Sequence, residues 1–310
     1  MIKKILIDTD IGGDCDDAGA LALANMFMDN GDIEIVGVTF TTSCEFGPAC
    51  ISAINTYYGH GDIPISATSR KNFCGKANAF QRVLATTYPN KLYDVESQST
   101  VPTPDAVRFM RKTLAFSDER IDIVCIGQLN NISDLLDSVA DDISPLDGVE
   151  LVAEKVGQIS VMGGLFDETG DTILFHGQPY TVEYNIETDA VSARNFVTKC
   201  PAEIVFCDFL VGYNVYTGST LLGKKKDNPV AEAYRIFQNS PRESWDPLTL
   251  WYAVKGEDGI FSLSPFGNVT VTAEGGTKFV QDKNGKHRYL RLVDTEQNVA
   301  KKLDDFLGSY

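Results

Sequence analysis

The sequence predicts an α/β protein with a single open, mostly parallel twisted sheet and helices on both faces. Short apolar, β-branched segments alternate along the chain with segments of helical length and composition. Strands joined in this way by helices are typical of a parallel sheet with right-handed crossovers, the arrangement of the Rossmann-like folds. The 310 residues contain no internal repeat, low-complexity tract or linker. We therefore expect one domain over residues 1–310.

In the first half of the chain, strand and helix signals alternate. An apolar run at residues 5–7 predicts a buried strand, and the Ala/Leu-rich residues 18–28 predict the helix that follows it. Residues 33–39 are β-branched and predict the second strand. Residues 48–59 carry Ala53, Ile54 and Tyr57 on one helical face, and residues 63–67 form a short third strand. The segment 68–102 is polar and irregular, and a loop of that length often carries function.

The second half continues the alternation and ends in strands and a helix. The expected helices span residues 104–116 (with Asp105 near the start), 131–139, 187–197, 248–254 and 297–307. The expected strands span residues 121–126, 159–164, 202–206, 268–274 and 288–293. Residues 165–182 are a polar loop, and 214–244 contain helical stretches broken by glycine and proline. Asn284-Gly285 is a turn signal between the last two strands.

The composition limits the partners and the compartment. A net charge of −16 disfavours nucleic acid and anionic membranes as partners, because both bind basic surfaces. No apolar run approaches the roughly 20 residues of a membrane span, and the first four residues lead directly into a strand without a signal peptide. Seven cysteines without a C-x-x-C pair predict buried thiols rather than a disulfide framework. We expect a cytoplasmic protein in which the lysine run 224–226 is a solvated surface.

The densest group of acidic residues follows the first strand. Five aspartates lie within ten residues, with two glycines that allow a tight bend: Asp8, Asp10, Asp14, Asp16 and Asp17. Carboxylates this close repel one another unless a cation lies among them, and their oxygens suit Ca²⁺ or Mg²⁺. The alternative is a helix N-terminus with acidic residues in its first turn. Capping accounts for one or two of the five, so the pattern favours a hard-cation site.

Other polar residues lie at the expected ends of strands. Ligands in parallel α/β sheets bind beyond the carboxyl ends of the strands, so these groups should converge on one crevice. They are Asn130 and Asn131 after residues 121–126, Met162-Gly163-Gly164 at the end of the next strand, Glu183 and Asn185 in an apolar setting, and Asp246 before an apolar helix. Taken alone, Asp246 followed by Pro247 is typical of an ordinary helix N-cap with proline at the first helical position.

Together these segments resemble the nucleoside hydrolase family of inosine-uridine preferring N-ribohydrolases, most closely its purine-preferring branch. The likeness runs in the same order from the first strand to the last helix. Asp8, Asp10, Gly12 and the pair Asp16-Asp17 are similar to the signature Asp-x-Asp-x-Gly-x-Asp-Asp, with two additional residues before the pair. The stretches 127–131, 162–164, 183–185 and 245–247 resemble the family motifs Gly-x-Leu-Thr-Asn, Met-Gly-Gly, Glu-Phe/Trp-Asn and the C-terminal Asp motif.

The resemblance implies a hydrolase that cleaves the N-glycosidic bond of purine ribonucleosides to base and ribose, in purine salvage. It implies a Ca²⁺ ion held by Asp10, Asp17, Asp246 and the backbone carbonyl of Asn130, with Asp16 as general base for the attacking water. Substrate contacts are implied for Glu183, Asn185 and Met162, as well as for Asp16, Asp246 and Trp245, the last by stacking on the base. A homodimer or homotetramer is implied as well. Asp8 and Asp14 have no assigned ligand role; Asp14 either orients a metal ligand or caps the helix.

The sequence also departs from the family pattern. Trp245 stands where many members have a histidine that serves as leaving-group acid. The ribose-binding asparagine expected after the second strand is replaced by the segment 43–45, and another expected before Glu183 falls at Gly177, next to His176. His176 is either a substitute contact or a surface loop residue. These departures leave open a protein that binds metal and ribosyl groups without catalysis. A phosphotransferase with Asp8 as nucleophile is a third reading, but it lacks a lysine partner and leaves Asp246 without a role.

Overall fold

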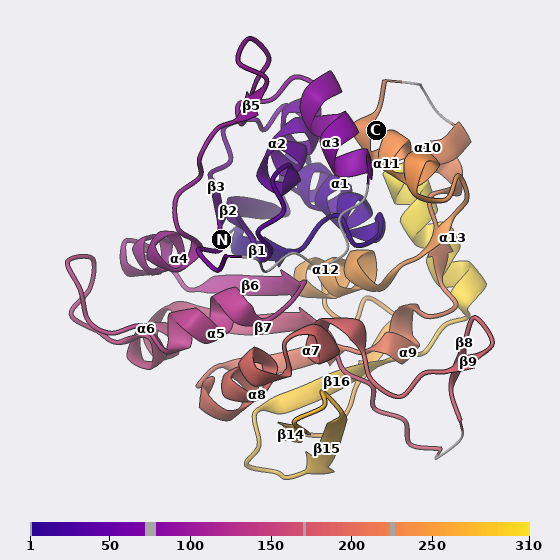
Figure 1. The fold of residues 1–310 in the computed structure, drawn as a ribbon. Helices are drawn as coiled ribbons and strands as arrows, with labels where there is room; N and C mark the ends of the chain where they lie inside the picture. Colours follow the sequence, from indigo (N-terminus) through magenta and orange to yellow (C-terminus); the bar gives the residue numbers. More distant parts are fainter. Residues whose placement is uncertain (1, 72–78, 170–171, 224–226) are drawn as a thin grey trace.

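A mostly parallel sheet lies at the centre of the molecule and confirms the predicted fold class (Figure 1). The computed structural model describes residues 2–71, 79–169, 172–223 and 227–310. The strands of the main sheet are β1 (Lys3–Thr9), β2 (Ile33–Phe40), β3 (Ile65–Ala67), β6 (Ile121–Ile126), β7 (Val156–Met162), β10 (Glu203–Cys207), β13 (Phe261–Leu263), β14 (Gly267–Val271), β15 (Thr277–Gln281) and β16 (His287–Leu292).

The strand order is β15-β14-β16-β10-β7-β6-β1-β2-β3, and β13 pairs with β16 beside this path. The strands from β16 to β3 pair in parallel. The pairings of β13, β14 and β15 are antiparallel. Strand β1 therefore lies inside the sheet, with β2 on one side and β6 on the other, and the order of the strands along the chain reverses around it. This is the position at which parallel α/β sheets open a crevice for ligands.

Helices and short two-residue strand pairs complete the fold. The helices are α1 (Asp16–Asp29), α2 (Gly47–Tyr57), α3 (Ala79–Thr87), α4 (Ala106–Ala115), α5 (Asn130–Leu136), α6 (Gly148–Lys155), α7 (Tyr184–Thr188), α8 (Ala190–Lys199), α9 (Phe209–Gly212), α10 (Ser219–Gly223), α11 (Pro229–Phe237), α12 (Trp245–Lys255) and α13 (Glu296–Leu307). The short pairs are β4 (Tyr93–Asp94) with β5 (Ser99–Thr100), β8 (Leu174–Phe175) with β9 (Gln178–Pro179), and β11 (Tyr216–Thr217) with β12 (Arg242–Glu243).

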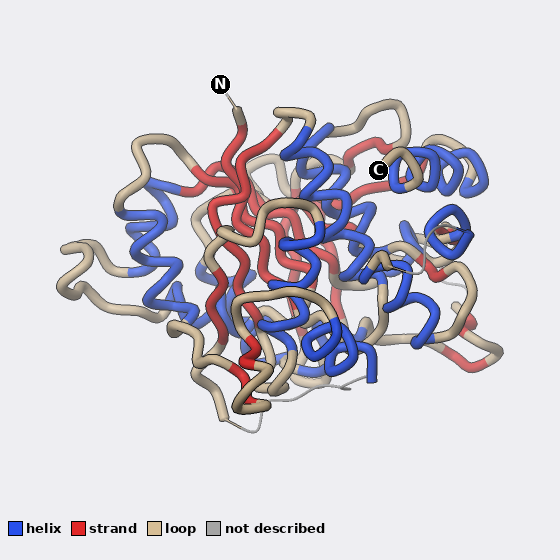
Figure 2. The backbone as a smooth tube through the Cα atoms, turned by 90° about the horizontal axis from the view of Figure 1, so that it is seen from above, coloured by secondary structure: helices blue, strands red, loops and turns tan. Residues whose placement is uncertain are grey.

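The sheet has a separate hydrophobic core on each face, and Figure 2 shows from above that helices lie on both sides of the strands. In β1 the side chains of Ile5 and Ile7 join one core, and that of Leu6 joins the other, because successive side chains of a strand point to opposite faces. The first core is formed with α1, α2, α3, α11, α12 and α13. The second is formed with α4, α5, α6 and α8. The apolar run of β1 is thus buried on both faces, as expected for a central parallel strand.

Helices α1 and α12 pack against each other in the first core and are buried along most of their length. Both are apolar on all sides, which is typical of helices enclosed within a protein. Gly19 of α1 also lies close to α11, because a Cβ at this position would lie 2.6 Å from the Tyr234 hydroxyl. The first turns of α1 and α12, 16–17 and 245–246, lie near one another.

Several local predictions were wrong. Residues 68–102, expected as irregular, contain α3 and the β4–β5 pair. Helix α6 and the strands β13 and β15 were not predicted. In α3 only four of the nine residues are buried, so its weak apolar pattern resembled a loop. Strand β15 is mostly exposed at the edge of the sheet, where burial imposes no clear alternation.

The cysteines follow the prediction with one exception. Cys15, Cys50, Cys125, Cys200 and Cys207 are free and buried. Cys44 is disulfide-bonded. Most of the cysteines are thus buried thiols as expected, and the sequence did not indicate the bond at Cys44, because spacing alone does not give disulfide pairing. Cys74 and the lysine run 224–226 lie outside the described residues. Among the helices that the structure describes, none is long and apolar enough to span a membrane.

Candidate active site

The loop after β1 carries the acidic residues to the carboxyl end of the sheet. The Thr9 hydroxyl, at the end of β1, donates to Asp17 and accepts the Ile11 amide, which fixes the bend. Gln128, after β6, donates to Asp10 over 2.8 Å and accepts from Thr41 after β2. Neutral side chains thus hold both carboxylates, Thr9 that of Asp17 and Gln128 that of Asp10. Neither carboxylate forms an ion pair with a described basic residue.

Close packing at the end of β6 places Asp10. A Cβ at Gly127 would lie 2.6 Å from the Asp10 backbone nitrogen, so only glycine allows the strand ends this close. Figure 1 shows β1 and β6 side by side at this point.

Asp16 joins the N-termini of α1 and α12. Its Oδ2 accepts the backbone amides of Trp245 and Asp246, each over 3.1 Å. Free amides at a helix N-terminus carry partial positive charge, which suits a carboxylate acceptor. Asp246 lies in the first turn of α12 rather than at its N-cap, which is Ser244. The ordinary reading of Asp246 as a helix cap is therefore wrong.

Glu183 and Asn185 approach from the far half of the chain. The Glu183 carboxylate caps α7 and accepts amides from Asn185, Ile186 and, over 3.2 Å, Gly164 after β7. The Asn185 amide nitrogen donates to the carbonyl and sulfur of Met162. These hydrogen bonds hold α7 against the end of β7, so that Glu183 and Asn185 lie at the carboxyl end of the sheet.

Nine of the site residues predicted from the sequence line one cavity of about 610 Å³. They are Asp10, Asp14, Asp16, Asp17, Met162, Glu183, Asn185, Trp245 and Asp246. Asp8 and Asn130 do not line it. Asp8 is fully buried behind the site, where it accepts from Thr39 and Asn131. The Asn130 side chain donates to the Thr41 carbonyl, and its Oδ1 is buried without a hydrogen-bond partner.

The cavity is rich in acidic groups. Among the residues that the structure describes, its walls hold six carboxyl groups and one guanidinium, that of Arg242. Burial, followed by the charges of Asp14 and Asp17, raises the pKa of Asp16 well above its usual value. Burial, with Asp16 and Asp17 next, has the same effect on the pKa of Asp246. The pKa of Asp17 is also raised, by burial and then by Asp10, and that of Asp10 rises to about 7 through burial.

This arrangement fits a divalent cation. Carboxylate oxygens of Asp14, Asp16 and Asp17 lie within 4.8 Å of one another, close enough to share an ion. Repulsion among these groups disappears when a hard cation with oxygen ligands lies between them. The donor set is therefore suited to Ca²⁺ or Mg²⁺ rather than to a soft metal.

Asp14 differs from the other acidic groups because it has a cationic partner. Its Oδ2 accepts from Arg242 over 2.8 Å, and its Oδ1 accepts the Asp16 amide. Burial alone would raise the pKa of Asp14, but hydrogen bonding at Asp16 and the Arg242 charge outweigh it and hold the pKa below its usual value. Asp14 is not the N-cap of α1, which is Cys15, although it accepts the amide of the first helical residue. The sequence analysis did not predict its contact with Arg242.

An aromatic wall faces the carboxylates. Phe209 stacks between Tyr180 (4.1 Å between ring centroids) and Trp245 (5.4 Å), and Phe175 meets both Phe209 and Trp245 edge to face. Trp245 lines the cavity but is only 6% exposed, and its indole nitrogen donates to the Phe209 carbonyl. Its ring is therefore part of a packed aromatic stack.

Sequence reasoning missed Arg242 and most of this wall. Arg242 lies in a segment broken by glycine and proline, and no motif marks it. Phe175, Tyr180 and Phe209 come from the β8–β9 loop and the short helix α9, where a single aromatic residue carries no positional signal. His176 is exposed next to Phe175 and does not line the cavity, in agreement with the surface reading.

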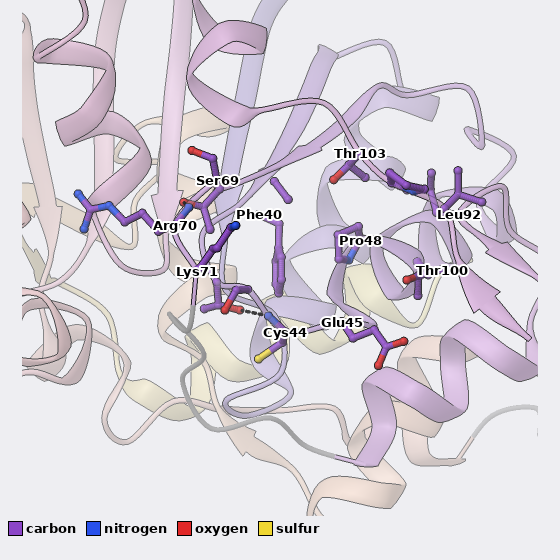
Figure 3. A pocket seen from close by; sticks show the side chains of 17 residues that line it. Phe40, Cys44, Glu45, Pro48, Ser69, Arg70, Lys71, Leu92, Thr100 and Thr103 are labelled. Carbon is purple, nitrogen blue, oxygen red and sulfur yellow. Dashed lines mark hydrogen bonds between the residues drawn. The ribbon is translucent and has the colours of Figure 1, made fainter.

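A second cavity, of about 290 Å³, lies beyond the ends of β2 and β3 (Figure 3). Ser43, Cys44 and Glu45 line this cavity and not the acidic one. The Cys44 amide donates to Thr42 within the same turn. The segment that replaces the expected ribose-binding asparagine thus faces away from the acidic cavity.

Comparisons with known proteins agree with the motif pattern. The family model described as inosine-uridine preferring nucleoside hydrolase matches residues 5–305. Similar solved structures include an inosine-uridine preferring nucleoside hydrolase from Bacillus anthracis (18% identity, 100% of both chains, TM-score 0.71) and a plant nucleoside hydrolase (22%, 100% of both, 0.69). A purine-preferring ribonucleoside hydrolase from Gardnerella vaginalis is 18% identical over 99% of this chain and 100% of its own, with a TM-score of 0.69. No curated protein matched the chain.

Proposed function

Because the chain belongs to the inosine-uridine preferring nucleoside hydrolase family, and is thus an N-glycosyl hydrolase, we propose that it is a Ca²⁺-dependent hydrolase of purine ribonucleosides that releases base and ribose. One observation carries the proposal. Carboxylates from the two ends of the chain, Asp10, Asp16 and Asp17 near the start and Asp246 near the end, line one cavity together with Glu183.

The proposed ligands of the ion are Asp10, Asp17, Asp246 and the backbone carbonyl of Asn130. The first three are supported by their place in the cavity wall and by burial that leaves their charges uncompensated. When bound, the ion supplies positive charge that lowers the pKa of a water molecule and holds sugar hydroxyls. Asp8 supports this cluster from behind through its hydrogen bonds with Thr39 and Asn131.

Asp16 is the proposed general base. Two backbone amides hold its Oδ2, so its Oδ1 is the oxygen that takes the proton from the attacking water. Glu183 and Asn185 are proposed to bind ribose hydroxyls, and Met162 to contact the sugar from the floor of the cavity. Nearby carboxylates stabilise the positive charge that develops on the sugar ring as the bond breaks.

The preference for purines is supported by the aromatic wall. Phe175, Tyr180, Phe209 and Trp245 provide the apolar, aromatic surface that a large base buries. A purine-preferring enzyme is among the similar structures. Trp245 is proposed to contact the base through the edge of its ring that lines the cavity.

Purine salvage in the cytoplasm, as a homodimer or homotetramer, completes the proposal. It is supported by the resemblance of the sequence to the family. Light scattering coupled to gel filtration tests the oligomeric state directly.

The activity is tested with a panel of ribonucleosides. The protein is incubated with inosine, adenosine, guanosine, uridine and cytidine in the presence of Ca²⁺, and reducing sugar is measured. Release from purine nucleosides faster than from pyrimidine nucleosides, abolished by EDTA and restored by Ca²⁺, supports the proposal. Absence of release from all five by protein shown to contain metal would contradict it.

A second candidate is a protein that binds ribosyl groups without turnover. It is favoured by the segment 43–45, which lines a cavity other than the acidic one. This candidate predicts nucleoside binding by calorimetry with no sugar released. The hydrolase proposal predicts both binding and release, so the same samples distinguish the two.

A further inference from the structure

Arg242 is the cationic side chain in the wall of an acidic cavity, and the reaction proposed above gives it no role. It belongs to β12, four residues before Asp246, and its side chain is 12% exposed. The guanidinium lies 5.1 Å from the centre of the Trp245 ring and 5.3 Å from that of Phe237. It therefore lies against the aromatic part of the cavity, where a base would be bound.

Two carboxylates hold the guanidinium in place. One terminal nitrogen donates to Asp14 and the other to Glu243, each over 2.8 Å. Glu243 is itself held by the Tyr216 hydroxyl. Asp14 belongs to the two residues by which the loop after β1 exceeds the family signature. The Arg242–Asp14 pair is thus a feature of this longer loop.

The guanidinium retains unused hydrogen-bond donors. It has five N–H groups, and two of them are used by Asp14 and Glu243. Nε is buried and has no hydrogen-bond partner among the described residues, so the donors available to a ligand in the cavity are the remaining N–H groups of the two terminal nitrogens. Holding a planar, charged donor rigidly with unused N–H groups is how proteins prepare a site for an acceptor-rich group.

The departing base needs such a group. When a glycosidic bond to nitrogen breaks, the electron pair remains on the base and spreads over its ring nitrogens and carbonyl oxygens. No histidine is found among the residues described as lining the cavity, and its acidic groups face the charge that develops on the sugar. Arg242 is the one lining residue with positive charge on the aromatic side.

We propose that Arg242 is a catalytic residue for departure of the base: its unused N–H groups donate hydrogen bonds to acceptor atoms of the nucleobase as negative charge develops there. This inference rests on the proposed function. The bond between C1′ and the base nitrogen breaks, and its electron pair goes to the base. The oxygen of water bonds to C1′, and the proton of that water goes to Asp16. The base takes a proton from solvent, and Arg242 keeps its own. The ligand class is a base with ring-nitrogen or carbonyl acceptors.

The test compares two leaving groups on the same sugar. One substrate is inosine, and the other is p-nitrophenyl β-D-ribofuranoside, whose nitrophenolate departs without assistance. We expect Arg242→Gln to lower kcat on inosine on the order of 10²-fold, as loss of one preorganised donor does, and to cause a much smaller loss on the nitrophenyl riboside. Arg242→Lys keeps the charge beside Asp14 but lacks the planar fork, and should show the same selective loss.

The outcomes separate the two proposals. Equal losses on both substrates, or no loss on inosine, overturn the role of Arg242 while the hydrolase assignment stands. Wild-type protein that cleaves neither substrate overturns the hydrolase assignment itself. Arg108→Gln, at an exposed arginine paired with Asp142, is the matched control and should leave both rates unchanged. If Arg242→Gln fails to fold, as judged by circular dichroism, Arg242→Lys decides the question.

Discussion

Asn in place of Asp16 tests the proposed base with little effect on the fold. The Asn side chain keeps one oxygen, which can accept the same two amides, those of Trp245 and Asp246. The connection between α1 and α12 should therefore survive. The other oxygen becomes an amide that cannot take a proton from water. Removal of a general base costs about 10²–10⁴-fold in rate, or about 3–5 kcal/mol of activation free energy.

The stability of the same variant has a definite sign. Burial and the neighbouring carboxylates raise the pKa of Asp16, so its negative charge destabilises the metal-free fold at neutral pH. Asp16→Asn removes that charge, and we expect the free energy of unfolding in EDTA to stay level or increase. Asp16→Ala instead leaves two buried amides without an acceptor, at a cost of about 1–3 kcal/mol each.

The assay combines sugar release with urea denaturation. Asp16→Asn should bind Ca²⁺, unfold at the wild-type urea concentration or above, and release sugar at least about 10²-fold more slowly. Asp105→Asn is the matched control, because Asp105 caps α4 and Asn caps helices equally well. Asp16→Asn with sugar release close to the wild-type rate would refute the assignment of the base. Loss of its folded structure would refute the reasoning about the two amides.

Three further results are expected from the structure. Burial raises the pKa of Glu183 from an ordinary 4.5 to about 7, so between these pH values the unfolded chain loses a proton that the folded protein keeps. Other buried carboxyl groups act in the same direction, so the contribution of Glu183 is the difference between wild type and Glu183→Gln in EDTA; it should lower the free energy of unfolding by about 3 kcal/mol from pH 4.5 to pH 8, measured with urea. Arg111 is 2% exposed and donates to the buried carbonyl of Ser144, so Arg111→Met leaves that acceptor unpaired and should cost about 1–3 kcal/mol of stability without changing kcat at 25 °C. Gly127→Ala would place a Cβ 2.6 Å from the Asp10 nitrogen, and should lower both Ca²⁺ affinity and sugar release.

Each of these results has a control and a contrary outcome. A fall in the free energy of unfolding from pH 4.5 to 8 that is as large in Glu183→Gln as in wild type would contradict the role derived for Glu183. Arg108→Met removes an exposed ion pair and should leave stability close to that of wild type; a loss as large as that of Arg111→Met would contradict the burial argument. A Cβ at Gly223 meets no atom within 4 Å, so Gly223→Ala should leave Ca²⁺ affinity unchanged. If Gly127→Ala did the same, the close packing at Asp10 would be unimportant.

Local patterns of apolar residues in the sequence predict much of the α/β architecture. The run at residues 5–7 is apolar because both faces of β1 are buried, and this alone predicts a central strand. The alternation of such runs with helical segments then implies parallel pairing. Edge and surface elements such as α3, α6 and β15 escape the same reasoning, because few of their residues are buried and their patterns are weak.

The sequence likewise predicts only part of the candidate site. Five aspartates within ten residues, and motifs in family order, were enough to name Asp10, Asp16, Asp17 and Asp246 from the sequence. Carboxylates so close together need a cation, and that requirement is local. Their common cavity depends on packing: the first turn of α12 meets that of α1, where Asp16 accepts the backbone amides of Trp245 and Asp246.

Only the tertiary structure showed which basic and aromatic residues line the cavity together with the carboxylates. Arg242, Phe175 and Phe209 come from short segments that carry no periodic signal, and cysteine spacing does not reveal that Cys44 is disulfide-bonded. Hydrophobic periodicity records which face of an element is buried, so a sequence determines its strands and helices. It does not record which distant side chain fills the space beyond a strand end, because that contact depends on how whole elements pack.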